Sequence, residues 1–163
     1  MLQLNCIKKR DLNHIKFYTE KELPDFGKRG IRMCHSITID KDRKLAQINA
    51  RGRVNVLELK EIFMNTVGHE DWQSGFNMLC DYSEIEDFDV SSQDVNDITE
   101  WQISIDALIG NGRCAVVASK DSVYGMSRMW EILSSERSQQ ICVFRKIDDA
   151  FSWLGYAILT QSV

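Results

Sequence analysis

Residues 113–130, RCAVVASKDSVYGMSRMW, are the stretch that decides the fold. The stretch begins with an unbroken apolar run, 114–118, which is typical of a strand covered on both faces. After a short polar segment, one apolar helix face is formed by Met126, Met129, Trp130 and Leu133. The sequence therefore predicts a buried strand that turns directly into an amphipathic helix. In parallel sheets such a turn lies at the carboxyl end of the strand, where α/β proteins bind their ligands.

Length and charge limit the class of protein. The chain has 163 residues, which suits one domain, and its formal net charge of −4 offers no basic field for a nucleic-acid backbone. Apolar runs fall short of the ~20 residues that span a bilayer, and the N-terminus lacks the apolar segment of a secretory signal. We expect a cytoplasmic protein that binds no nucleic acid and has no integral membrane segment.

Cysteines and histidines give no sign of a metal centre. The chain has five cysteines, an odd number, without a C-x-x-C spacing. Cys80, Cys114 and Cys142 lie in apolar strand-like runs, where a thiol behaves as a small hydrophobic group. His69 has acidic neighbours, but adjacent loop residues rarely close a metal site without distant partners. We predict reduced thiols, no metal and no cofactor.

The chain divides into three parts. Residues 1–32 are rich in Lys and Arg and show weak apolar periodicity, so we interpret them as an N-terminal arm packed on the domain edge or as an extension. Residues 33–155 carry the regular patterns and form the predicted domain, and residues 156–163 form a C-terminal tail.

The domain opens with a hairpin followed by a helix. Residues 35–39 and 45–50 alternate in polarity and predict two antiparallel strands, which Gly52 ends. Asn55 and Glu58 stand at the spacing of a capping box and predict the start of a helix. Its predicted inward positions are Leu59, Ile62, Phe63, Thr66 and Val67, before a stop at Gly68.

A strand, an acidic loop and a long helix come next. The short apolar run 76–80 predicts a strand, which leads into the acidic loop 81–89. Ser91 or Ser92 caps the helix, and Gly110 follows its end. The predicted core positions of this helix are Val95, Ile98, Trp101 or Gln102, Ile105, and Leu108 or Ile109.

The last two elements complete an α/β order. Residues 141–144 predict another covered strand, and residues 147–154 a short helix that Gly155 closes. The order β-β-α-β-α-β-α-β-α predicts a mixed, mostly parallel sheet with helices packed on it. We expect strand 113–118 to lie between 76–80 and 141–144.

Several of these segments together resemble the SpoIIAA-like bacterial domains, which are also called STAS-like or STAS/SEC14-like. The resemblance lies in strand 115–118 with the following 124–129, in 143–145, and in the sequence Cys80-Asp81 at the end of a strand; Ala150, Trp153 and Leu154 complete it. It covers about residues 33–155. It implies a SpoIIAA-like fold and a regulatory relative of the anti-sigma-factor antagonists. Many members of the SpoIIAA-like family have no assigned activity.

The resemblance also points to a phosphorylation site. Anti-sigma-factor antagonists carry a phosphorylatable serine in an Asp-Ser-Ser-Gly pattern at a helix N-terminus. The comparable stretch here is 89–94, DVSSQD, which departs from the pattern by a valine, by the missing glycine and by extra acids. Ser91 or Ser92 is the candidate, although nearby acids oppose a phosphate. The alternative is that the serine only caps the helix.

The loop after the decisive strand is the predicted contact site. Residues 119–125 combine a cation, hydroxyls, helix N–H groups and a glycine, which together suit an anionic or polar group. The alternative is helix capping by Asp121 or Ser122, a solvated lysine, and a glycine needed for helix-to-sheet packing. Arg128 points either to solvent or over the same mouth. The predicted contact residues are Asp81, Lys120, Ser122, Tyr124, Gly125 and Arg128.

Three functions compete on these observations. The first is a non-enzymatic regulatory or protein-interaction domain that meets a signalling or anti-sigma-type partner, or a second copy, through loop 81–89 and the next helix. The second is a carrier of a small hydrophobic ligand or lipid, which needs a cavity between Trp101, Met126, Met129 and Trp130. The third is an enzyme of unknown reaction, but the sequence shows no nucleophile with a base at a recognisable spacing.

Overall fold

A computed structural model describes residues 34–157 as one α/β domain with a five-stranded sheet in the order β1-β2-β3-β4-β5. The strands are β1 (Cys34–Asp40), β2 (Leu45–Asn55), β3 (Asn77–Asp89), β4 (Arg113–Val117) and β5 (Gln140–Phe144). The helices are α1 (Val56–Val67), α2 (Ser92–Ser104), α3 (Asp106–Ile109), α4 (Asp121–Leu133) and α5 (Ile147–Leu154). The predicted arm 1–32 lies outside the described residues.

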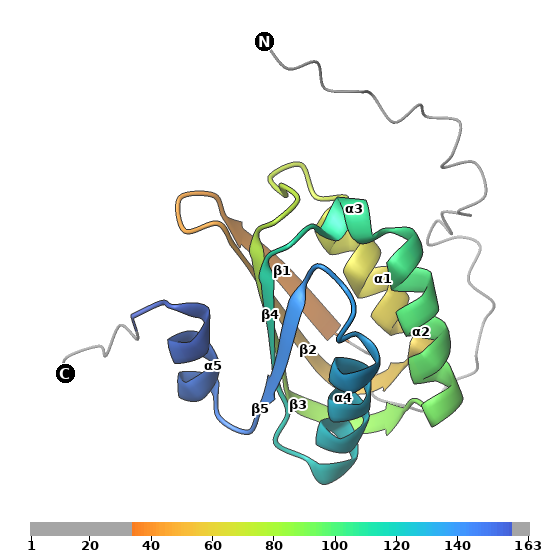
Figure 1. The fold of residues 1–163 in the computed structure, drawn as a ribbon. Helices are drawn as coiled ribbons and strands as arrows, with labels where there is room; N and C mark the ends of the chain where they lie inside the picture. Colours follow the sequence, from red (N-terminus) through yellow and green to blue (C-terminus); the bar gives the residue numbers. More distant parts are fainter. Residues whose placement is uncertain (1–33, 158–163) are drawn as a thin grey trace, which may run out of the picture.

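The sheet is mixed, as predicted. β1 and β2 pair antiparallel, and β2, β3, β4 and β5 pair parallel. β4 lies between β3 and β5, and its Ala115 and Val116 are 0% and 1% exposed. The predicted neighbours of strand 113–118 are therefore confirmed. Helices α1, α2 and α4 cover one face of the sheet, and α5 lies on the other (Figure 1).

Alternating side chains build a core on each face of the sheet. On the side of α1, α2 and α4, Ile48, Met78 and Val116 belong to a large buried cluster. On the opposite side, Leu79 and Val117 belong to a smaller cluster that includes α5. α5 packs on β3, β4 and β5, and this second core also includes Leu45 at the start of β2.

Two strands are longer than the sequence predicts. β2 continues past Gly52, which has a φ of +83°, to Asn55. β3 continues through the predicted acidic loop 81–89, so that prediction is wrong. Acidic side chains there alternate with buried ones such as Ile85, which is the pattern of a strand with one wet face. The two extensions pair with each other in parallel.

The start of α1 confirms the predicted capping box. The side-chain oxygen of Asn55 accepts hydrogen bonds from the backbone N–H groups of Leu57 and Glu58, at 2.9 and 3.1 Å. Glu58 returns a carboxylate oxygen to the N–H of Asn55, at 2.8 Å. Gly68 is the C-cap, and the predicted inward stripe is buried except for Val67, which is half-buried.

The long helix predicted after Ser91 is two helices, because the chain breaks at Ile105. At the two positions that the sequence left open, Gln102 and Ile109 are the buried residues. The inward face of α4 also differs from the prediction, since Val123, Ser127 and Trp130 are its buried residues and Leu133 is 40% exposed.

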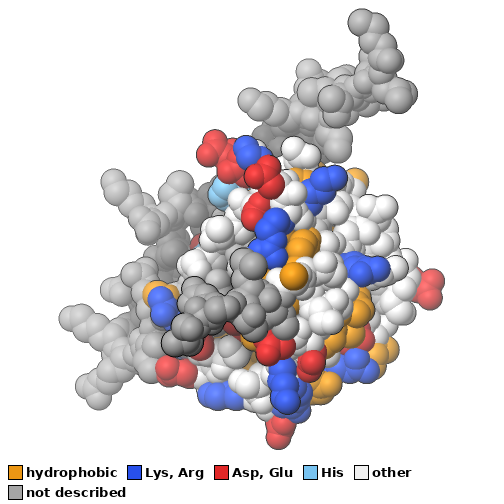
Figure 2. Space-filling view, turned by 90° about the vertical axis from the view of Figure 1, so that its left-hand side faces the viewer, with side chains coloured by type: hydrophobic (Ala, Val, Ile, Leu, Met, Phe, Trp, Pro, Cys, Tyr) orange, Lys and Arg blue, Asp and Glu red, His pale blue; other side chains and the backbone are white. Residues whose placement is uncertain are grey.

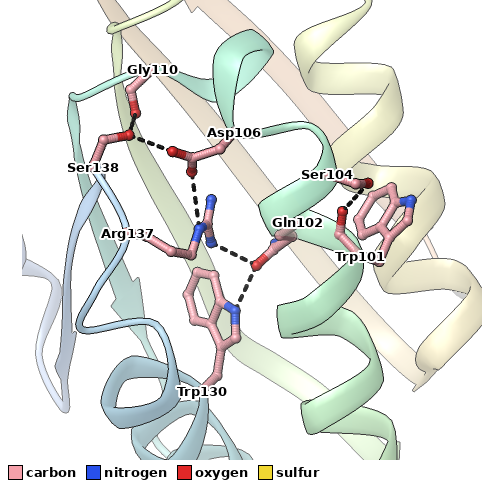
Figure 3. A network of polar contacts seen from close by, with 8 residues as sticks. All are labelled: Trp101, Gln102, Ser104, Asp106, Gly110, Trp130, Arg137 and Ser138. Atoms are coloured by element: carbon pink, nitrogen blue, oxygen red, sulfur yellow. Dashed lines mark hydrogen bonds and ion pairs between the residues drawn. The ribbon is translucent and has the colours of Figure 1, made fainter. Parts of the chain in front are cut away.

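A buried polar network explains why Gln102 faces inward (Figure 3). Its side-chain oxygen accepts hydrogen bonds from Trp130 Nε1 at 2.7 Å and from Arg137 Nη1 at 2.8 Å. Arg137, whose side chain is 3% exposed, also pairs through Nε with Asp106 at 3.1 Å. Ser138 donates to the other carboxylate oxygen of Asp106, at 2.6 Å. The network joins α2, α3, α4 and the segment before β5.

Stability is expected to decrease in acid because carboxylates that include Asp94 and Asp106 have lowered pKa values. Hydrogen bonds from Ser91 lower the pKa of Asp94. Burial raises the pKa of Asp106, but the hydrogen bonds from Ser138 and Arg137 outweigh it and the net shift is downward. Because these folded-state pKa values lie below the unfolded value of about 3.9, the stabilisation is present above pH ~4 and is lost as the pH falls through the folded values.

Urea titrations between pH 7 and pH 3 measure this loss. The Asp106→Asn variant is expected to be less stable at pH 7 and to lose less stability than the wild type as the pH falls. Equal losses in the two proteins would contradict a contribution from Asp106.

The described cysteines, which include Cys80 and Cys114, are unpaired. The Sγ atoms of these two are 4.0 Å apart. The register pairs Cys80 with Val116, two positions beyond Cys114, so their Cα atoms are separated diagonally by roughly 7–8 Å. A disulfide at that separation requires backbone movement. The hydrogen bond with Cys80 and burial raise the pKa of Cys114 well above its usual value, which keeps that thiol protonated.

Candidate functional site

The candidate site is the rim where β3 extends beyond its neighbour β4. Pairing between the two strands ends at Asp81 and Val117, but β3 continues to Asp89 beside β2 alone. This end of the sheet, where α2 and α4 begin, is lowest in Figure 1. The second half of β3 therefore has one edge without a strand partner.

Two bulges shape the extended half of β3. Between Asp81 and Glu84, β3 has one residue more than β2, and a second shift in register follows Ile85. The carboxylate of Asp81 accepts hydrogen bonds from the backbone N–H of Ser83 at 3.0 Å and from its hydroxyl at 2.6 Å. Asp81, a predicted contact residue, thus stabilises the first bulge.

The loop between β4 and α4 takes the place of the missing strand. The Ser119 hydroxyl donates to the carbonyl oxygen of Ser83 at 3.0 Å. Lys120 Nζ donates to the carbonyl oxygen of Glu86 at 2.8 Å. The predicted contact residue Lys120 is therefore not simply solvated, because it holds β3 in place across the rim.

Arg145, which is not among the predicted contact residues, organises the same loop from the end of β5. Its guanidinium donates to the carbonyl oxygen of Ser119 and to a carboxylate oxygen of Asp121, both at 2.7 Å. The Cζ atom of Arg145 also lies 3.8 Å from the centre of the Tyr124 ring, which is cation–π contact. In the sequence, Arg145 is a basic residue directly after a covered strand, within the segment 143–145 that carries part of the resemblance.

Carboxylates dominate the surface of the rim. Glu84, Glu86, Asp87 and Asp89 on β3 are exposed. Arg53 on β2 pairs with two of them, Asp87 at 3.2 Å and Asp89 at 3.3 Å. The rim therefore keeps a negative excess that suits basic groups.

A polar groove of about 320 Å³ lies beside this rim, on the sheet face that carries α5. Its lining residues are Cys34, His35, Ser36, Asn49, Ala50, Arg51, Asp81, Ser83 and Glu84. The groove lies over β1, β2 and the first bulge of β3, whereas α5 covers the other half of the face. Figure 2, which views this side of the molecule, shows acidic and basic side chains interspersed with apolar ones.

Most of the predicted contact residues lie along the rim, but Arg128 does not. Its guanidinium binds Glu131 at 2.6 Å, and the carboxylate of Glu131 accepts the backbone N–H of Val143 on the outer edge of β5. Ser122 is exposed near the start of α4. Gly125 is also exposed, and a Cβ atom there would meet nothing within 4 Å. The alternative that Gly125 is needed for helix-to-sheet packing is therefore wrong.

Other functional elements are limited in the described part of the chain. Residues 34–157 contain no group of three or more His, Cys, Asp or Glu side chains that could hold a metal ion. In the same range, none of the helices combines the length and the apolar character that crossing a membrane requires.

Comparison with known proteins identifies the fold. Neither a family model nor a curated protein matches the chain. The structure is similar to the crystal structure of an uncharacterised DUF3478-family protein with a SpoIIAA-like fold from Shewanella loihica PV-4, with a TM-score of 0.51 and 14% sequence identity. The similarity covers 78% of this chain and 99% of that chain. The fold is SpoIIAA-like. The sequence-based prediction of fold is thereby confirmed.

In this SpoIIAA-like domain Ser91 and Ser92 lie at the start of α2, which follows β3. The loop with Lys120 follows the neighbouring strand β4. Ser91 is the N-cap, and its hydroxyl oxygen accepts the backbone N–H of Asp94 at 3.2 Å. Asp94 in turn accepts the N–H and the hydroxyl of Ser91, at 2.8 and 2.6 Å. Ser91 therefore caps α2, as the sequence predicted for one of the two serines. Phosphorylation of Ser91 or of the exposed Ser92 stays a prediction.

The SpoIIAA-like domain also has a small apolar cavity between the sheet and helices α1, α2 and α4. Its volume is about 40 Å³, and Met126 and Trp130 are among its lining residues. The other two residues predicted to enclose a ligand cavity, Trp101 and Met129, do not line it. Pockets for drug-sized ligands have volumes of roughly 300–1,000 Å³, so this cavity is far below what a lipid needs.

Proposed function

We propose that the protein is a non-enzymatic regulatory domain that binds a basic segment of a protein partner through the acidic rim of β3. The observation that carries the proposal is the extension of β3 beyond β4, which presents Glu84, Glu86, Asp87 and Asp89 at one edge of the sheet. The expected site of action is the cytoplasm.

The rim suits protein recognition because its backbone is held in place. Ser119 and Lys120 hold the carbonyl groups of the two bulged segments, and Arg145 holds the loop that carries them. A prearranged surface loses little conformational entropy on binding, which favours affinity. Exposed carboxylates accelerate association with a basic partner and select against acidic ones.

The competing functions receive less support. A ligand carrier needs more room than the 40 Å³ cavity provides. For an enzyme, the hydroxyl contacts of the rim serve the backbone: Asp81 accepts both the hydroxyl and the N–H of Ser83 within a bulge, and the Ser119 hydroxyl donates to a backbone carbonyl.

Charge reversal on the rim is expected to remove partner binding. The test variant is Glu84→Lys/Glu86→Lys/Asp87→Lys in the full chain, whose exposed side chains can change without loss of core packing. Immobilised wild type and variant are exposed to an extract of the producing cells, and the retained proteins are quantified by mass spectrometry. We expect basic proteins retained by the wild type to be lost from the variant, and more strongly at low salt.

A matched control separates a specific loss from a change in net charge. The control carries Glu70→Lys/Glu136→Lys/Asp149→Lys, three exposed acids away from the rim. It is expected to retain the same proteins as the wild type, with circular dichroism unchanged in both variants. Retention of the same proteins by the rim variant would refute the proposal, as would equal losses from rim variant and control.

A further inference from the structure

The polar groove opens beside the point where the N-terminal segment joins the domain. The groove has a volume of about 320 Å³, and Cys34, the first described residue, forms part of its wall. In β2 the side chains of Asn49 and Arg51 alternate with the buried Ile48 and Ala50, so they point to the α5 side of the sheet. Cys34, to which residues 1–33 are joined in the chain, therefore lies at the groove itself.

Charge is distributed unequally between this segment and the rest of the chain. Residues 1–33 contain eight of the 20 Lys and Arg residues but only four of the 24 Asp and Glu residues. The segment therefore carries a formal charge of +4 and the remaining residues −8, which together give the net charge of −4. Opposite charges this large on a tether attract each other at moderate ionic strength.

The groove offers acceptors for basic side chains. Asp81 and Glu84 line it, and the exposed carboxylate of Glu86 follows on the same strand. Arg51 is the one Lys or Arg in the lining, and its guanidinium is in none of the ion pairs among residues 34–157. The acids of the segment, which are Asp11, Glu20, Glu22 and Asp25, are of the right kind to meet it.

We propose that the basic N-terminal segment, residues 1–33, occupies this groove of its own domain. Length permits it, because 33 extended residues reach roughly 110 Å, far more than a groove three strands wide. A tethered segment also binds at a high effective concentration, so modest attraction is sufficient. If the proposed partner binding is correct, the segment competes with the basic partner for the carboxylates of β3; the docking itself does not depend on that partner.

A spin label on the segment tests the docking without any partner. Cys6 is labelled in the full chain carrying Cys34→Ser and Cys142→Ser, since Cys80 and Cys114 are buried and protected. A second preparation carries the label at Thr19→Cys in the same background with Cys6→Ser. We expect the backbone amide NMR signals of Ser36, Asn49 and Glu84 to lose intensity at low salt with at least one label, relative to those of Ile132 on the far side.

Charge variants decide whether the groove is the binding site. Glu84→Lys is expected to restore the groove signals, whereas the matched change Glu61→Lys on α1 is expected to leave the loss intact. Groove signals that keep full intensity with both labels would overturn the proposal, as would a loss unaffected by Glu84→Lys. A loss that grows with protein concentration would assign the groove to the segment of a second copy and also overturn docking within one chain.

Discussion

Replacing Arg137 by alanine is expected to lower the free energy of unfolding by about 3 kcal/mol, because its buried guanidinium bonds a buried amide oxygen and a carboxylate that both lose their partner. The Arg137 side chain is 3% exposed and bonds both Gln102 and Asp106. Its loss removes a donor from the buried Gln102 oxygen and the cation from the Asp106 carboxylate. Urea or guanidinium unfolding, followed by circular dichroism, measures the change.

Arg128→Ala is the matched control for this prediction. Arg128 also forms an ion pair, with Glu131 at 2.6 Å, but its side chain is 43% exposed. Exposed pairs contribute about 0.2–1 kcal/mol, so the control is expected to lose much less stability. An equal decrease in the free energy of unfolding in the two variants would show that burial of Arg137 does not determine how much its contacts stabilise the fold.

Gly110→Ala is expected to destabilise the fold by about 3 kcal/mol, because it combines backbone strain with overpacking. Gly110 has a φ of +81°, a region that residues with a Cβ atom disfavour. An added Cβ would lie 2.9 Å from the Cα atom of Gly75 and closer still to its backbone nitrogen. That nitrogen donates a hydrogen bond to the carbonyl of Ile109 at 2.9 Å. Movement of Gly75 to relieve the clash would therefore weaken this hydrogen bond.

Gly125→Ala provides the opposite expectation within the same protein. Gly125 lies inside α4, and a Cβ atom there has open space. Alanine is favoured over glycine in a helix interior by roughly 0.5–1 kcal/mol, so this variant should be more stable than the wild type. Thermal unfolding of the two variants and the wild type tests whether Gly110→Ala lowers the stability and Gly125→Ala raises it. A stable Gly110→Ala protein, or a destabilised Gly125→Ala protein, would contradict the local geometry described above.

Local patterns in the sequence determined the elements and their order. The apolar run 114–118 predicts an interior strand because a strand with partners and cover on both sides leaves no polar position. Asn55 and Glu58 predict the start of α1 because a capping box needs only residues three apart. Such signals act over a few residues, so one sequence is enough to reveal them. The order of elements then limits the sheet to few topologies, and the predicted one is correct.

Only the tertiary structure decided where strands end and what the polar side chains of the site do. The acidic residues of 81–89 are typical of a loop by composition. They form a strand because β2, which is distant in the sequence, supplies strand partners such as Arg53 for Asp87 and Asn55 for Asp89. Lys120 has a role because β4 ends before β3 and leaves the carbonyl of Glu86 without a strand partner. Gln102 faces inward because Trp130 and Arg137 donate to it from other elements. Buried polar groups require hydrogen-bond partners. Because the partners here are distant in the sequence, the local sequence pattern around each residue does not predict them.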